Sequence, residues 1–86
     1  MAVYIDAAMI PYRGMHMSHM MADTLEELHA MAERIGLRRD WFQDHPRHPH
    51  YDVSASKRTL AIHYDAQPVT SRCLVRLMSP KRSPVP

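Results

Sequence analysis

Two segments near the N-terminus have the alternating pattern of β-strands. Residues 3–5 form a short run rich in β-forming side chains that ends at Asp6. In residues 15–21 one side of a strand would carry Met15, Met17, His19 and Met21, and the other side His16, Ser18 and Met20. Successive side chains of a strand point to opposite faces, so this alternation fits a strand with two different faces. Both segments are therefore predicted to be strands.

A helical repeat of apolar residues follows the second strand. Asp23 and Glu26 have the spacing of a capping box, in which a carboxylate accepts free amide hydrogens at the start of a helix. Gly36 stands where a left-handed residue is needed to end the helix. These signals predict a helix over residues 24–35 that buries its apolar positions, which are Leu25, Leu28, Ala32 and Ile35.

The second half of the chain has weaker but recognisable signals. Two prolines in residues 43–49 predict a loop, and residues 50–53 are expected to be extended. Asp52 or Ser54 would then cap a second helix. A short strand around residues 68–70 and a last helix with Leu74, Leu77 and Met78 complete the order of elements.

These elements predict the fold class and the domain organisation. The alternation of helix and strand favours crossover connections and a partly parallel sheet. We expect an α/β or α+β fold in which a small mixed sheet of three or four short strands packs against two or three helices. Residues 1–78 are expected to form a single globular domain, and the proline-rich residues 79–86 a disordered tail.

Composition excludes several classes of protein. The single cysteine allows neither an internal disulfide nor a cysteine-rich zinc site, which favours a reducing, cytoplasmic compartment. Every apolar run is shorter than the roughly 20 residues that span a bilayer. The N-terminus does not have the pattern of a signal peptide. The two glycines lie too far apart for a phosphate-binding loop, which argues against the common nucleotide-binding motifs.

Positive charge is concentrated in the C-terminal part, although the net charge is only +2. Residues 57–86 contain one acidic residue among several lysines and arginines, which suits contact with nucleic acid or a solvated basic tail. Lys57 and Arg58 open the second helix, where their charge opposes the helix dipole. They are candidates for binding an anionic substrate, and a salt bridge with Asp52 is the alternative.

The seven histidines are the strongest chemical feature of the sequence. His50 and Asp52 would project to one face of the extended segment, with Tyr51 between them pointing into the core. This pair could ligate a metal ion, or the carboxylate could orient an imidazole that acts as a catalytic base. The structural alternative makes Asp52 a helix cap and leaves His50 a surface hydrogen bond.

Three other polar residues have both a functional and a structural interpretation. His19 lies among methionines, a mixture of ligands that suits copper, although the methionines are better explained by core packing. His29 lies at the edge of the apolar stripe of the first helix, where ion pairs with nearby glutamates are the alternative to a ligand role. Asp6 ends a strand, a common place for a catalytic carboxylate and also for a turn.

Several short segments, in order, resemble one known family. They are residues 3–6, 18–20, 23, 27–29, 50–53 and 72–77. Together they resemble domain of unknown function 4031, an uncharacterised family of short phage and bacterial proteins with an HYD motif. The resemblance implies a domain of nearly the whole chain length from a phage or bacterial cytoplasm. It also implies that Asp65 stands where glycine is typical, and that the motif positions include His19, Asp23, His29, His50 and Asp52.

Three functions from different classes are compatible with these features. The first is a site for a divalent metal or a phosphate group, with His19, His29, His50 and Asp52 as metal ligands. His50 and Asp52 would serve a metal-assisted hydrolase of nucleic acid or nucleotides, with Lys57 and Arg58 binding the substrate. The second is a non-catalytic protein that modulates a host protein. The third is a nucleic-acid-binding module that uses the basic C-terminal half.

Overall fold

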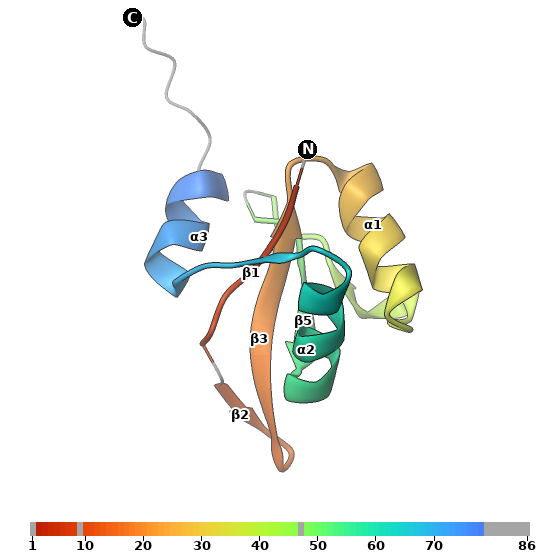
Figure 1. The fold of residues 1–86 in the computed structure, drawn as a ribbon, viewed down its shortest axis with the longest axis vertical. Coiled ribbons are helices and arrows are strands. Elements are labelled where there is room, and N and C mark those ends of the chain that lie inside the picture. Colours follow the sequence, from red (N-terminus) through yellow and green to blue (C-terminus); the bar gives the residue numbers. More distant parts are fainter. Residues whose placement is uncertain (1, 9, 47, 79–86) are drawn as a thin grey trace, which may run out of the picture.

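A mixed sheet with helices on both sides forms the part of the chain that the computed structural model describes, residues 2–8, 10–46 and 48–78 (Figure 1). The strands are β1 (Val3–Ile5), β2 (Ile10–Tyr12), β3 (Met15–Ala22), β4 (Phe42–Gln43), β5 (His50–Ser54) and β6 (Gln67–Pro68). The helices are α1 (Leu25–Arg34), η1 (Arg39–Trp41), α2 (Ala55–His63) and α3 (Ser71–Met78). The predicted α+β class is confirmed. The proposed tail, residues 79–86, lies outside the described residues.

The sheet has six strands within the described residues, more than the three or four that the sequence predicts. Its order is β4-β5-β3-β1-β6, and β2 pairs with β3. The additional strands are β2, which contains Pro11, and the two-residue β4. Both are too short to show an alternating pattern. The pairing of β1 with β6 is parallel and the other pairings are antiparallel, so the sheet is mixed as expected.

The eight-residue strand β3 lies at the centre of the sheet and gives it two distinct faces. Ile5 pairs with Met20, which in turn pairs with Tyr51, and these three side chains are fully buried on one face. Helices α1 and α2 cover this face, and α3 lies on the other side of the sheet (Figure 1). His19 pairs with Asp52 on that other face. The core consists of Val3, Ile5, Met20, Leu28, Met31, Ala32, Ile35, Leu37, Tyr51, Val53, Ala61 and Ala66.

Helix α1 begins one residue later than the predicted capping box. Thr24 is the N-cap, and its hydroxyl accepts a hydrogen bond from the amide of Glu27 at 3.2 Å. Asp23 instead accepts hydrogen bonds from the Ala2 amide and the Tyr4 hydroxyl, which fastens β1 to the end of β3. Leu28, Ala32 and Ile35 are buried as predicted, but Leu25 is 49% exposed. The predicted burial of Leu25, the first residue of the helix, is therefore wrong.

The start of α2 decides between the two predicted caps. The Ser54 hydroxyl accepts a hydrogen bond from the amide of Lys57, so Ser54 is the N-cap. Asp52 lies two residues earlier in β5 and is not used as a cap. After α2, Asp65 has a φ of 79° and occupies the left-handed region at the helix end. None of the described helices is long and apolar enough to cross a membrane.

A candidate metal site on the α3 side of the sheet

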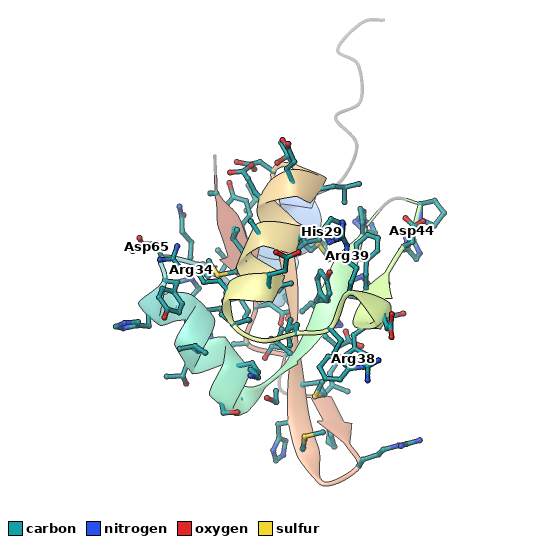
Figure 2. All side chains as sticks on the ribbon, turned by 90° about the vertical axis from the view of Figure 1, so that its right-hand side faces the viewer. His29, Arg34, Arg38, Arg39, Asp44 and Asp65 are labelled. Atoms are coloured by element: carbon teal, nitrogen blue, oxygen red, sulfur yellow. The ribbon has the colours of Figure 1, made fainter. Side chains whose placement is uncertain are left out.

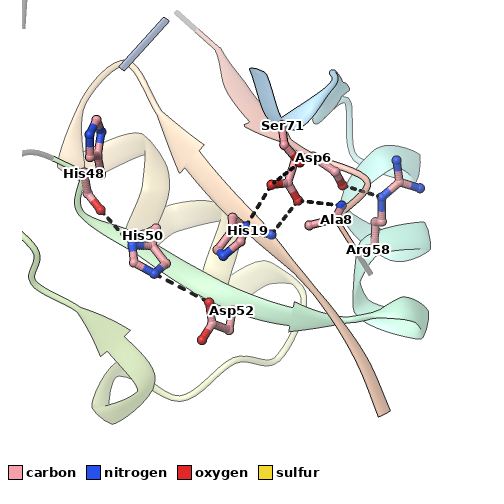
Figure 3. A network of polar contacts seen from close by, with 8 residues as sticks. All are labelled: Asp6, Ala8, His19, His48, His50, Asp52, Arg58 and Ser71. Atoms are coloured by element: carbon pink, nitrogen blue, oxygen red, sulfur yellow. Dashed lines mark hydrogen bonds and ion pairs between the residues drawn. The ribbon is translucent and has the colours of Figure 1, made fainter. Parts of the chain in front are cut away.

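Three polar side chains meet on the face of the sheet opposite α1 and α2. They are His19 from β3 and the pair His50 and Asp52 from β5 (Figure 3). Antiparallel pairing places His19 beside Asp52, and the two-residue repeat of the strand places His50 on the same face as Asp52. One potential ligand atom from each side chain lies within 4.8 Å of the other two. The same-face arrangement predicted for His50 and Asp52 is confirmed.

The ring of His50 is fixed by its own backbone neighbourhood. Nδ1 of His50 lies 2.7 Å from the carbonyl oxygen of His48, which can only accept a hydrogen bond. Nδ1 must therefore carry the proton, and in the neutral ring Nε2 carries a lone pair. This Nε2 lies 3.5 Å from Oδ1 of Asp52. Two acceptor atoms thus face each other in the cluster.

The ring of His19 is fixed in the same way by a carboxylate. Nδ1 of His19 lies 2.8 Å from Oδ2 of Asp6, which lies on the other side of the ring from His50 (Figure 3). An ionised carboxylate only accepts, so it selects the neutral tautomer with the proton on Nδ1 and the lone pair on Nε2. The rings of His19 and His50 lie edge to face, with centroids 5.5 Å apart.

Asp6 is buried, and several donors surround its carboxylate. The residue is only 1% exposed and follows directly after β1. It accepts hydrogen bonds from the His19 amide at 2.8 Å, the Ala8 amide at 3.2 Å and the Ser71 hydroxyl at 3.2 Å. Burial by itself raises the pKa of Asp6, but the hydrogen bonds from His19 and Ala8 outweigh it and hold the pKa below its usual value. The carboxylate is therefore ionised at neutral pH.

The cluster is open to solvent on one side. The side chain of Asp52 is 42% exposed, that of His19 is 30% exposed and that of His50 is 19% exposed. Ligand atoms about 2.1 Å from a tetrahedral zinc ion lie about 3.4 Å apart. The separations in the cluster are at most 4.8 Å, so a single ion would require the three ligand atoms to move closer together.

His29, the fourth predicted metal ligand, lies on the other side of the sheet. It belongs to α1, and its Nδ1 is hydrogen-bonded to the hydroxyl of Tyr51 at 2.8 Å. Burial lowers the pKa of His29, the nearby Arg39 lowers it further, and Glu33 partly opposes them (Figure 2). The structure therefore brings together three of the four predicted ligands and separates His29 from them.

Lys57 and Arg58, the predicted substrate-binding residues, contact backbone carbonyl groups. Nζ of Lys57 donates to the carbonyl of Ile35 at 2.7 Å, at the C-terminal end of α1. Nε of Arg58 donates to the carbonyl of Asp6 at 2.8 Å, on the side of Asp6 away from His50 (Figure 3). Both side chains tie α2 to neighbouring elements, and these contacts direct them away from the cluster.

Sequence reasoning identified part of the surroundings of the site. The position of Asp6 at the end of a strand marked it as a candidate carboxylate, but its contact with His19 could not be inferred from local spacing. Ser71 and the carbonyl of His48 were missed, since a hydroxyl in a helix start and a backbone oxygen carry no distinguishing signal in the sequence. Met20 and Met21 are buried, which supports packing over copper for these two methionines, whereas Met15 is 46% exposed.

The fold and the site define a small α+β domain with a surface cluster of two histidines and a carboxylate. The chain belongs to the family described as protein of unknown function (DUF4031), whose model matches residues 3–81. This confirms the family expected from the sequence and covers every residue of the cluster. No curated protein and no solved structure matches the chain.

Proposed function

We propose that this protein binds a divalent metal ion through His19, His50 and Asp52, and that the metal serves a hydrolytic reaction on phosphate esters of nucleic acid or nucleotides. One observation carries the metal-binding part. Both imidazoles donate Nδ1–H to a fixed acceptor, and the potential ligand atoms of the three residues lie within 4.8 Å. Histidines that ligate metals in proteins almost always have such a partner on the other ring nitrogen.

The electrostatics of the cluster favour a cation over a phosphate group. With each ring proton on Nδ1, the Nε2 lone pairs of both histidines and the oxygens of Asp52 would repel an anion and attract a positive ion. A proton shared by His50 and Asp52 is the simplest alternative to a metal. Nε2 and Oδ1 are 3.5 Å apart, which is longer than the roughly 2.7–2.9 Å of a charge-assisted hydrogen bond and leaves space for a larger ion.

The ligand types favour a transition metal over magnesium or calcium. Imidazole suits zinc, iron, nickel and copper, whereas magnesium and calcium prefer oxygen ligands. Two histidines and one carboxylate form a common set of protein ligands in catalytic zinc sites, where a water molecule completes the coordination. Zinc is therefore the ion that we expect to bind at this cluster.

The hydrolytic part of the proposal follows from the open side of the cluster. Three protein ligands leave a position for water, and a bound zinc ion lowers the pKa of such a water to about 7. The exposed position of Asp52 would let substrate approach from solvent. An oxygen of the Asp52 carboxylate not used to hold the metal could accept the proton of an attacking water.

Metal binding can be tested by calorimetry and thermal unfolding with zinc, manganese and magnesium. We expect zinc to bind with a stoichiometry of one and to raise the melting temperature, because it binds the folded state. His50→Ala should lose most of this effect. His63→Ala is a matched control, because His63 is exposed at the end of α2 and packs on Tyr64. Equal behaviour of the two variants, or no heat with wild type, would refute the metal site.

Activity can be tested on the zinc-loaded protein with bis(p-nitrophenyl) phosphate and with single-stranded and double-stranded oligonucleotides. We expect turnover that requires the metal and that disappears in His50→Ala and Asp52→Ala but not in His63→Ala. Metal binding without turnover of any of these substrates would refute the hydrolase and retain the metal site. The two parts of the proposal can therefore fail separately.

A further inference from the structure

We propose that Asp6 is the positioning residue of the site: its buried carboxylate fixes the tautomer and orientation of His19, so that Nε2 is available as a ligand. This inference rests on the proposed function but concerns a residue outside the ligand set. Asp6 and His19 are thirteen positions apart, and their contact joins the end of β1 to the middle of β3. Asp6 would touch neither the metal nor the substrate.

The carboxylate of Asp6 holds His19 through two hydrogen bonds, one to its main chain and one to its ring. Oδ1 of Asp6 accepts the backbone amide of His19 at 2.8 Å, and Oδ2 accepts Nδ1 of the same residue at 2.8 Å. The first bond fixes the main chain and the second fixes the ring. Because both the main chain and the ring of His19 are held, the ring can rotate little. Its Nε2 therefore keeps its direction toward the side of His50 and Asp52 (Figure 3).

The charge of Asp6 also suits a cation at His19. Asp6 is 1% exposed, and the other described donors to its carboxylate oxygens are two backbone amides and the Ser71 hydroxyl, which are neutral. Arg58 contacts the carbonyl group of Asp6 through Nε. A cation bound to Nε2 makes the imidazole more positive, which the buried negative charge stabilises. Asp6 therefore raises the affinity of His19 for a metal ion.

Helix α3 contributes to the same arrangement. Ser71, the first residue of α3, donates its hydroxyl to the oxygen of Asp6 that also contacts His19. This bond ties the carboxylate to α3. A purely structural role is the alternative, in which Asp6 merely closes the turn after β1 through its contact with the Ala8 amide. The two roles differ in what they predict for the His19 ring.

The substitution Asp6→Asn separates them. The amide oxygen of Asn can replace Oδ1 and accept both backbone amides, whereas its NH₂ group must occupy the position of Oδ2. That group can only donate, so Nδ1 of His19 would have to accept and the ring proton would move to Nε2. The shape and the backbone contacts are retained while the ligand atom is blocked. Ser71→Ala is the control that removes one neutral hydrogen bond and leaves the carboxylate.

The decisive measurement is ¹H–¹⁵N long-range NMR of the histidine rings in metal-free protein near pH 8, together with zinc affinity. We expect the Nδ1–H tautomer for His19 in wild type and Ser71→Ala, and the Nε2–H tautomer in Asp6→Asn. Zinc affinity should fall about 10- to 100-fold in Asp6→Asn, and less in Ser71→Ala.

Several outcomes would overturn the inference. An Nε2–H tautomer of His19 in wild type would do so even if the variant failed to fold. An unchanged tautomer or an unchanged zinc affinity in folded Asp6→Asn would also overturn it, because Asp6 would then be structural. If wild type bound no metal while the tautomer changed as expected, the proposed function would fail and the orienting contact would remain.

Discussion

The hydroxyl of Tyr51 and Nδ1 of His29 are joined by a hydrogen bond of 2.8 Å between the middle of β5 and helix α1. Tyr51 is fully buried, although its sequence neighbours His50 and Asp52 point to the opposite face. Three consecutive residues therefore serve both faces of the sheet. The central one anchors β5 to the core, and the outer two present their side chains to the candidate metal site.

This relationship predicts a moderate effect of Tyr51→Phe on stability. Removing the hydroxyl leaves Nδ1 of His29 without this partner while the ring still fills the core. We expect the free energy of unfolding in urea to fall by about 0.5–1.5 kcal/mol. Zinc affinity should change little, because the ring keeps β5 in place. A fall in zinc affinity by several orders of magnitude in Tyr51→Phe would contradict this expectation. It would show that the hydroxyl itself positions the ligands.

A second prediction concerns the pH dependence of stability near neutrality. Burial, together with Arg39, holds the pKa of His29 below its unfolded value of about 6.5. Between this lowered pKa and about pH 6.5, the unfolded chain therefore binds more protons than the folded protein. The contribution of His29 is fully present above about pH 6.5 and is lost as the pH falls through the lower folded pKa.

Melting temperatures of wild type and His29→Gln between about pH 8 and pH 5 would test this dependence. The glutamine can still form a hydrogen bond with Tyr51 but does not titrate. The other histidines contribute equally to both proteins, so the difference between the curves isolates His29. We expect the wild type to lose more stability on acidification than the variant. Parallel curves would contradict the prediction.

Two leucines of α1 should respond very differently to truncation. Leu28 is 1% exposed within the core, so Leu28→Ala should cost about 2–5 kcal/mol through lost burial and a cavity. Leu25 is 49% exposed, and Leu25→Ala should change the free energy of unfolding by less than about 0.5 kcal/mol. Both replacements occur in the same helix and have the same effect on helix propensity. Similar losses in chemical denaturation would contradict the observed phase of the helix.

A fourth prediction is that Asp65→Gly stabilises the protein. Asp65 has a φ of 79° at the end of α2, a conformation that costs about 1 kcal/mol for most residues with a Cβ and nothing for glycine. We expect an increase of up to about 1 kcal/mol, partly offset by the greater freedom of glycine in the unfolded chain. Asp65→Ala retains the Cβ and should not stabilise. A higher melting temperature for the alanine variant would contradict this explanation.

Local sequence determined the elements whose signals repeat over a few residues. The alternation in β5 was sufficient to place His50 and Asp52 on one face and Tyr51 in the core, because backbone geometry alone sets a repeat of two. Helical spacing located α1 and most of its buried positions, and Gly36 marked its end with a φ of 84°. The sequence left Asp52 and Ser54 as candidates for the N-cap of α2. The structure uses Ser54, so the side chain of Asp52 is available to the candidate site.

Tertiary structure decided which of these side chains meet. The pairing of β3 with β5 put His19 next to Asp52, while the packing of α1 on the core face carried His29 to the other side. The hydrogen bond between Asp6 and the His19 ring depends on the pairing of β1 with β3. Such pairings are chosen by burial of one whole face of the sheet, which depends on residues far apart in the chain. Local periodicity fixes where each side chain points, but only the folded sheet fixes its neighbour.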